Sequence, residues 1–148
     1  MPTLLKTRLG VTNDECYTPK WIFDQLKIAF DLDVCAPKTQ THVPAQHKYT
    51  IDHDGLKSEW FGNVWMNPPY SKPGPWVARF MHHANGIALL PTSTGKWQLQ
   101  LWQDPQCKWV MLAPLKFEHY TRPLPTRCYL VGYGKTNIEA LQHFGLVR

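Results

Sequence analysis

Short apolar runs of strand length alternate with helix-length segments along most of this chain of 148 residues. The clearest strand-like runs are NVWMN (63–67), GIALLP (86–91), KWVMLA (108–113) and RCYLVGYG (127–134). Segments typical of helices are 75–84, 96–103 and 137–144. Parallel strands need long crossover connections, so this alternation favours a layered α/β domain with a largely parallel sheet. The pattern allows an antiparallel edge among the final strands.

The segment YTPKWIFDQLKIAF (17–30) predicts an amphipathic helix. Thr18 is a candidate N-cap, and Pro19 suits the first helical position because it has no amide hydrogen to lose. The apolar face of this helix is expected to consist of Ile22, Phe23, Leu26, Ala29 and Phe30.

The predicted helix leads into DLDVCAP (31–37), a short strand that ends in small residues. In the polar stretch that follows, the one candidate strand is KYTI (48–51). The interval between Pro37 and Ser58 is short for a full strand-helix-strand repeat. We therefore expect the sheet to be abridged.

The length and the 43% hydrophobic content are sufficient for one domain with a real core. We expect a single domain over 1–148, with residues 1–13 as a loose N-terminal arm. The longest apolar run is far shorter than a bilayer span, and the first residues lack the apolar core of a secretory signal. These features predict a soluble, cytoplasmic protein without a membrane partner.

The four cysteines, Cys16, Cys35, Cys107 and Cys128, are widely spaced and form no C-x-x-C pair. Reduced, buried thiols are expected. The ligand spacings typical of structural zinc are absent, so we expect no metal.

The net charge of +5 is unevenly distributed. Residues 1–66 carry seven Lys and Arg against eight Asp and Glu, whereas residues 67–148 carry nine against three. The second part could lie against a polyanion, although an ordinary solvated basic surface is an equal alternative on charge alone.

An apolar strand runs directly into NPPYSKPG (67–74). Pro68 and Pro69 have no amide hydrogens and fixed φ angles, so they cannot continue a sheet ladder. In parallel sheets, ligands sit outside the carboxyl ends of the strands where the strand order reverses. Because DVCAP and NPPY both lie at predicted strand ends, we expect them to face one crevice.

NPPY resembles the signature of methyltransferases that use S-adenosylmethionine to modify a planar nitrogen, in DNA adenine, some RNA bases or protein glutamine. Taken in order, CYTPKWIFDQL, DLDVCAP, DGLKSEWFGNVWMNPPYSKP and GIALLPTSTGKW resemble the compact phage DNA N-6-adenine-methyltransferase family, also called phage Dam. The similarity extends over roughly residues 14–134. It implies a compact, Rossmann-like class I methyltransferase fold, S-adenosylmethionine as cofactor and DNA adenine as substrate. A chain of phage origin would act in the bacterial cytoplasm.

The resemblance implies that the catalytic residues are Asn67, Pro68, Pro69 and Tyr70. Adenine's amine is a poor nucleophile because its lone pair is delocalised into the ring. The side-chain oxygen of Asn67 and the backbone carbonyl of Pro68 can accept the two amine hydrogens and localise that pair. Tyr70 offers a ring face for an extruded base.

The implied cofactor residues are Tyr17, Thr18, Pro19, Asp33, Cys35, Ala36, Asp54, Gly55 and Leu56. Amides at the first helix start can meet the cofactor carboxylate, although Thr18 also suits a simple cap. Asp33 is suited to the ammonium or ribose, with Asp52 a weaker ribose candidate, and Asp54 to the adenine amine. The glycine-rich turn that many such enzymes place after the first strand is missing.

Candidate phosphate contacts are Lys72, Lys96, Lys116, Arg122 and Arg127. Two alternatives stay open. One is a methyltransferase that acts on RNA or protein glutamine, and the other is a catalytically silent nucleic-acid-binding module. The recognition sequence is not predicted, and the state of assembly is either a monomer or a small homo-oligomer.

Overall fold

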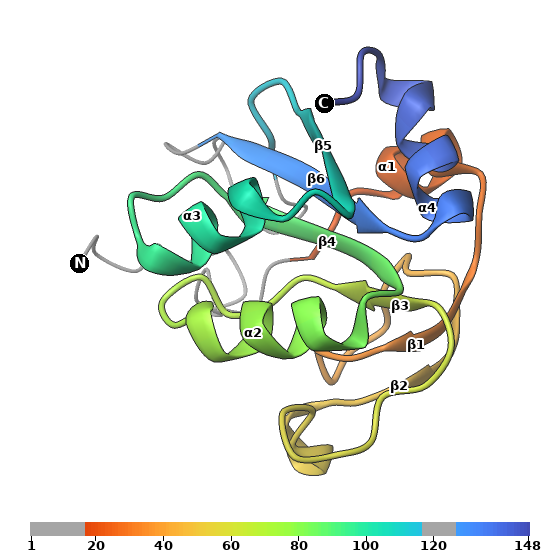
Figure 1. Ribbon diagram of the computed structural model, residues 1–148. Helices are drawn as coiled ribbons and strands as arrows, with labels where there is room; N and C mark the ends of the chain where they lie inside the picture. The colour runs from red at the N-terminus through yellow and green to blue at the C-terminus, as the bar shows by residue number, and fades with distance from the viewer. Residues whose placement is uncertain (1–16, 117–126) are drawn as a thin grey trace.

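A six-stranded sheet lies at the centre of the residues that the computed structural model describes, 17–116 and 127–148 (Figure 1). Its strands are β1 (Phe30–Asp33), β2 (Ala45–Lys48), β3 (Val64–Met66), β4 (Gly86–Pro91), β5 (Cys107–Met111) and β6 (Cys128–Tyr133). They lie in the order β2-β1-β3-β4-β6-β5. The strands β2, β1, β3 and β4 pair in parallel, and β6 runs antiparallel to both of its neighbours. The α/β architecture expected from the sequence is confirmed.

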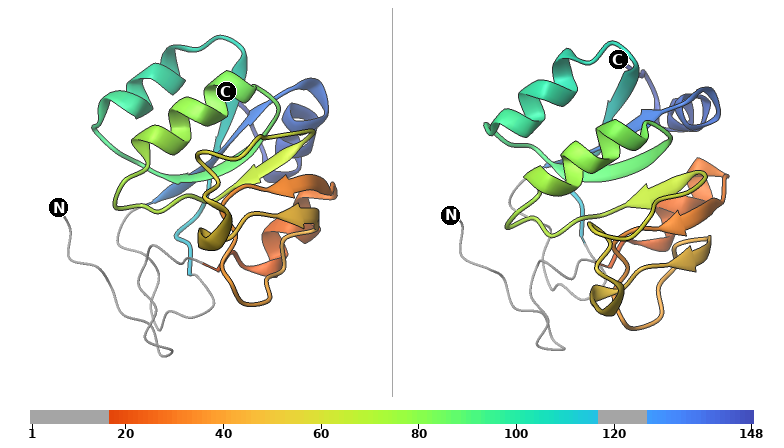
Figure 2. Two further views of the ribbon diagram at one scale, coloured as in Figure 1. Left: turned by 90° about the horizontal axis from the view of Figure 1, so that it is seen from below. Right: turned by 60° about the horizontal axis from the view of Figure 1, so that its bottom comes forward.

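Within the described residues, helices cover both faces of this sheet. They are α1 (Lys20–Leu26), α2 (Gly74–His83), α3 (Lys96–Gln103) and α4 (Lys135–Leu141), with short 3-10 helices η1 (Ile51–His53) and η2 (Gln142–Phe144). Helices α2 and α3 lie on one face, and α1 and α4 lie on the other (Figure 2). The molecule therefore has three layers.

Side chains of the central strands alternate between two cores. In β3, Val64 and Met66 belong to the core beneath α2 and α3, whereas Trp65 belongs to the core beneath α1 and α4. The Phe23 ring of α1 packs edge-on against Trp65, with ring centroids 4.8 Å apart. Strands that are covered on both faces read as continuous apolar runs, as GIALLP does.

The first helix is shorter than its periodicity predicts. Pro19, with extended backbone, is the N-cap residue, and Thr18 therefore caps nothing. Lys27 adopts the left-handed conformation, with φ 60°, and its amide bonds to the Phe23 carbonyl, which ends the helix. Phe30 opens β1 instead of continuing the helical face. The expectations for Thr18 and Pro19 were wrong because the helix begins one residue later, at Lys20. Those for Ala29 and Phe30 were wrong because the helix ends at Leu26: Ala29 is exposed, and Phe30 pairs with Ala45 in the sheet.

The interval between β1 and β3 is abridged, as expected. Residues 34–63 are all described and contain β2 and η1 but no α-helix. Strand β2 ends at Lys48, so the candidate strand 48–51 was wrong beyond its first residue. Thr50 and His53 form a capping box that turns the chain into η1.

Strands β3, β4, β5 and β6, together with α2 and α3, begin and end within two residues of their predicted bounds. Strand β1 ends at Asp33, four residues before the end of the 31–37 run, and α4 spans Lys135–Leu141 instead of 137–144. Cys107 and Cys128 are buried free thiols, whereas Cys35 is half-buried. Residues 1–13, Cys16 and Arg122 lie outside the described ranges. No helix in those ranges has both the length and the apolar character that crossing a membrane requires.

Candidate active site

The strand order reverses between β1 and β3. The chain passes from β1 outward to β2 and then returns to place β3 on the other side of β1. The carboxyl ends of these strands carry Asp33 and Asn67, since Asp33 ends β1 and Asn67 follows β3. A switch point of this kind is where α/β sheets bind ligands.

A cavity of about 500 Å³ opens at this switch point. This volume lies within the range of small-molecule and cofactor sites. Six of the predicted site residues line it: Cys35, Ala36, Asp54, Gly55, Asn67 and Pro69. The structure thus brings the segments that follow β1, β2 and β3 to one cavity. The sequence predicted this for the segments after β1 and β3.

Other lining residues were missed by sequence reasoning. Tyr49, Thr50 and Ile51 follow β2, and Trp76 comes from α2. The rule that ligands gather at strand ends could have found the first three, had β2 been placed correctly. No local pattern marks Trp76, because it reaches the cavity only when α2 packs across the loop after η1.

Asn67 is buried at the wall of the cavity. Its side chain is 8% exposed, and its Nδ2 atom donates a hydrogen bond of 3.1 Å to Oγ1 of Thr18, which is 5% exposed. This bond joins the residue that follows β3 to the residue that precedes Pro19 and α1. The predicted donor-site residue Thr18 therefore contacts the predicted catalytic residue directly.

The two prolines form a rigid turn after Asn67. Pro68 is buried, and the Pro69 carbonyl accepts a hydrogen bond of 3.3 Å from the Lys72 amide. No backbone amide of the described residues donates a hydrogen bond to the Pro68 carbonyl. The fixed φ of each proline sets the direction of these carbonyls.

Tyr70 is half-buried and lies outside the set of cavity-lining residues. Its hydroxyl donates to the Leu89 carbonyl at 3.3 Å, and its ring packs against the core beneath α1 and α4. The hydrogen bond anchors the hydroxyl end of the side chain. Its role toward a base stays a prediction.

The remaining predicted cofactor residues do not line the cavity. Tyr17 is buried and its hydroxyl bonds to the Thr39 hydroxyl, while Pro19 is also buried. Leu56 is half-buried and follows the cavity residue Gly55. Their predicted contacts with a cofactor remain untested.

The DGL segment is held close to β1. A Cβ atom at Gly55 would lie 2.1 Å from the Val34 carbonyl oxygen and 2.9 Å from the Trp76 ring. The buried indole N–H of Trp60 donates to the Gly55 carbonyl at 2.7 Å. This contact gives a physical reason for the spacing of the DGL…W pattern, because Trp60 closes the loop on Gly55.

Arg79 of α2 fastens the same loop. Its guanidinium donates to the carbonyls of Leu56 and Ser58 at 2.6 and 2.8 Å and lies over the Trp60 ring, 5.1 Å from the centroid. A planar fork can reach two carbonyls and a ring at once, which a lysine ammonium cannot.

We expect Arg79→Ala to destabilise the protein by about 1–3 kcal/mol, because two charge-assisted hydrogen bonds are lost at a half-buried position. Thermal unfolding should show a midpoint lower by several degrees, on the order of 2–8 °C. Arg79→Lys should recover only part of this loss. An unchanged midpoint in Arg79→Ala would show that the loop is held by other contacts.

Asp33 is a buried carboxyl, 3% exposed, at the end of β1. Burial raises its pKa from 3.8 to about 7, and the Cys35 amide and the Lys48 charge lower it in part. The folded protein therefore binds this proton more tightly than the unfolded chain does between these two pH values.

We expect Asp33 to make the folded state less stable as the pH rises from about 4 to about 7, because ionisation there costs more in the folded protein. The contribution is on the order of 4 kcal/mol at 1.36 kcal/mol per pKa unit. Asp33→Asn mimics the protonated form. As the pH rises across this range, the midpoint of thermal unfolding should therefore fall more in the wild type than in Asp33→Asn. Parallel pH profiles of the two proteins would contradict the assignment.

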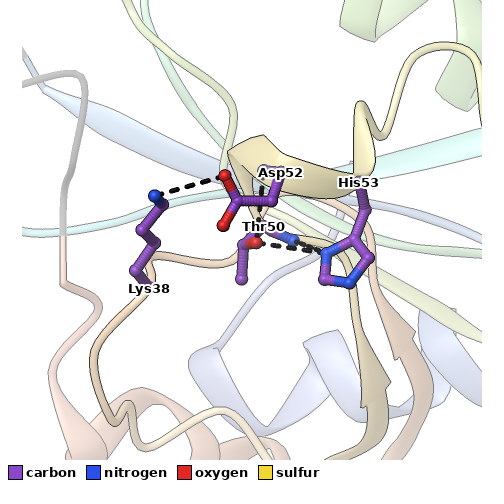
Figure 3. A network of polar contacts seen from close by, with 4 residues as sticks. All are labelled: Lys38, Thr50, Asp52 and His53. Carbon is purple, nitrogen blue, oxygen red and sulfur yellow. Dashed lines mark hydrogen bonds and ion pairs between the residues drawn. The ribbon is translucent and has the colours of Figure 1, made fainter.

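The mouth of the cavity carries a polar network (Figure 3). Lys38, which lines the cavity, forms an ion pair of 3.2 Å with Asp52. The Thr50 hydroxyl accepts from the Asp52 amide, and His53 Nδ1 accepts from the Thr50 amide at 3.0 Å. The loop after β1 is thereby tied to η1 at the cavity rim.

Basic side chains gather at the same edge of the sheet. Lys72 follows β3, Lys96 begins α3 after β4, Lys116 follows β5 and Arg127 precedes β6. Since β6 is antiparallel, its start lies at the carboxyl ends of the other strands. All four are exposed. The structure therefore brings four of the five predicted phosphate contacts to the edge that holds the cavity.

No three His, Cys, Asp or Glu side chains are grouped to hold a metal ion in the parts of the chain that the structure describes. The fold and the site together define an α/β protein with a ligand cavity at its switch point and an asparagine-proline turn on the cavity wall.

Residues 6–117, more than half of the chain, match the family described as DNA N-6-adenine-methyltransferase (Dam). The chain belongs to this family. It is also 37% identical over 83 residues to the DNA N-6-adenine-methyltransferase of Haemophilus phage HP1 (strain HP1c1), an alignment that covers 49% of this chain and 47% of that protein. The chain thus spans about half the length of this curated relative. No solved structure matches the chain.

Proposed function

We propose that residues 1–148 form a single methyltransferase domain that transfers a methyl group from S-adenosylmethionine to the exocyclic amine of adenine in DNA. The fold is proposed to be an abridged form of the Rossmann-like class I methyltransferase fold. The reversal of strand order between β1 and β3 supports this reading, as does the antiparallel β6. Family membership supports the reaction.

One observation carries the proposal. Asn67 stands at the carboxyl end of β3 and lines the same cavity as Asp54 and Gly55 of the DGL segment. A residue that can hold a substrate amine thus borders a hollow of cofactor size.

The cavity suits the proposed donor. Gly55 lets the loop approach Val34 closely, since a Cβ there would lie 2.1 Å from the Val34 carbonyl oxygen. Tyr49 and Trp76 give apolar walls on which an adenine ring can pack. Asp54 is a carboxylate on the same wall, suited to an adenine amine. When bound, S-adenosylmethionine would supply an electrophilic methyl group on a sulfonium sulfur.

The residues of the NPPY turn would activate the acceptor. The Asn67 amide oxygen and the Pro68 carbonyl accept the two hydrogens of the adenine amine, which favours a pyramidal nitrogen with a localised lone pair. Asn67 carries no carboxylate, so the proton leaves after transfer, to water or to a neighbouring group. Tyr70, whose hydroxyl is anchored on the Leu89 carbonyl, would stack on the extruded base.

The charge distribution fits a nucleic-acid substrate. Asp52 and Asp54 follow β2, on the side where a donor with net positive charge would bind. The exposed cations at the ends of β3 to β6 would contact phosphates. The two reactants would thus approach from opposite sides of Asn67.

A labelled methyl donor tests the proposal when it is offered with DNA, RNA and protein in separate reactions. We expect label in DNA, recovered after digestion as N6-methyl-deoxyadenosine by mass spectrometry of the nucleosides. Label in RNA or in protein glutamine instead would support the other acceptor classes. A chain that transfers no label and gives no heat with S-adenosylhomocysteine in calorimetry would be a silent binding module.

A further inference from the structure

The hydrogen bond between Asn67 and Thr18 joins two buried side chains that are 49 positions apart in the sequence. The Thr18 hydroxyl makes no capping bond to α1, so this contact is not a by-product of helix capping. The backbone around Thr18 is well anchored. Tyr17 bonds to Thr39 on one side, and the Pro19 carbonyl accepts from the Ile22 amide on the other.

The orientation of the Asn67 amide decides whether the site can work. A primary amide carries an acceptor oxygen and a donor nitrogen at nearly equivalent positions, and rotation by half a turn exchanges them. An adenine amine offers two hydrogens and therefore needs an acceptor. A rotated Asn67 would turn its own NH₂ group toward the substrate NH₂, and donor would then meet donor.

We propose that Thr18 is a positioning residue that anchors the Asn67 amide, an inference that rests on the proposed function. Its hydroxyl oxygen accepts from Nδ2 at 3.1 Å, with the nitrogen on the α1 side. The amide oxygen, which is buried in this structure, is the acceptor that Asn67 would then present to the amine. Without the Thr18 oxygen, the buried NH₂ group would lose this partner and rotate toward another acceptor.

This role differs from contact with the methyl donor. A residue that binds the donor changes its affinity, whereas a residue that orients Asn67 changes the rate of transfer at saturating donor and DNA. The variants Thr18→Val, Thr18→Cys and Thr18→Ser separate the two roles. Valine removes the hydroxyl at constant shape, cysteine leaves a weak acceptor, and serine keeps the oxygen.

The test measures kcat on adenine-containing DNA, the Kd for S-adenosylhomocysteine and thermal unfolding in each variant. Thr18→Val should lower kcat roughly tenfold or more, with the Kd changed less than about twofold. Thr18→Ser should keep most of the wild-type kcat, and the kcat of Thr18→Cys should lie between those of the serine and valine variants. If the valine variant does not fold, Thr18→Cys replaces it in the test. Thr136→Val on the exposed surface of α4 is the matched control and should leave kcat unchanged.

In an Asn67→Ala background, Thr18→Val should lower kcat no further, because the amide that it orients is gone. A wild-type kcat in Thr18→Val would overturn this inference but not the proposed function. A raised Kd for S-adenosylhomocysteine with an unchanged kcat would have the same consequence. A wild-type chain that methylates no adenine would overturn the proposed function, and this inference with it.

Discussion

Replacement of Asn67 by alanine should strongly lower the rate of adenine methylation, to a residual level that can still be measured, while the protein stays folded. The side-chain oxygen is one of two acceptors that hold the substrate amine, and removal of one such group from a preorganised site costs about 10²- to 10³-fold in kcat. The loss to folding should be small, about 1 kcal/mol, because one buried hydrogen bond to Thr18 disappears. Methyl transfer to DNA and thermal unfolding measure the two effects.

Asn67→Asp provides the matched comparison. Aspartate has the same shape and keeps acceptor oxygens, so it should retain more activity than alanine. Binding of S-adenosylhomocysteine should be similar in all three proteins, since other residues supply most of the cavity. Equal rates for Asn67→Ala and the wild type would exclude Asn67 from the reaction.

Gly55→Ala should weaken cofactor binding at least tenfold and destabilise the protein by about 1–3 kcal/mol, the usual cost of overpacking. The added Cβ would lie 2.1 Å from the Val34 carbonyl oxygen. This backbone atom cannot move aside cheaply, because Val34 directly follows β1 and its amide bonds to the Trp65 carbonyl of β3. The DGL loop would have to shift, and Asp54 with it. The backbone of Gly55 lies outside the left-handed region, so the effect is steric rather than conformational. Calorimetry with S-adenosylhomocysteine and thermal unfolding check both parts.

Gly74→Ala is the control for this substitution. A Cβ at Gly74 meets nothing within 4 Å, and the residue opens α2, where alanine is favourable. We expect unchanged affinity and equal or higher stability. If Gly55→Ala bound S-adenosylhomocysteine as tightly as Gly74→Ala, the cavity beside Gly55 would not be the cofactor site.

Strands and helices with clear periodicity could be predicted closely from the sequence. The runs that became β3 and β4 are buried on both faces, and their apolar character leaves little choice of structure. The predicted bounds of α1 were wrong at both ends. The local sequence pattern does not indicate that Lys27 adopts the left-handed conformation or that Phe30 belongs to the sheet. Tertiary packing overrides propensity in such short segments.

The site was predictable as a set of strand ends but not as a set of contacts. The NPPY and DGL patterns placed Asn67 and Gly55 correctly at one cavity. The bond from Asn67 to Thr18 and the grip of Arg79 on the DGL loop depend on how helices pack against loops distant in sequence. No spacing in the chain encodes those distances.

The central claim is that an amide oxygen and a backbone carbonyl hold a nucleobase amine opposite the methyl donor. A crystal structure with S-adenosylhomocysteine and an adenine-containing oligonucleotide tests it most directly. We expect the sulfur in the cavity beside Gly55 and the adenine amine within about 3.2 Å of both Asn67 Oδ1 and the Pro68 oxygen. An adenine bound elsewhere, or an Asn67 amide whose nitrogen faces the amine, would contradict the account.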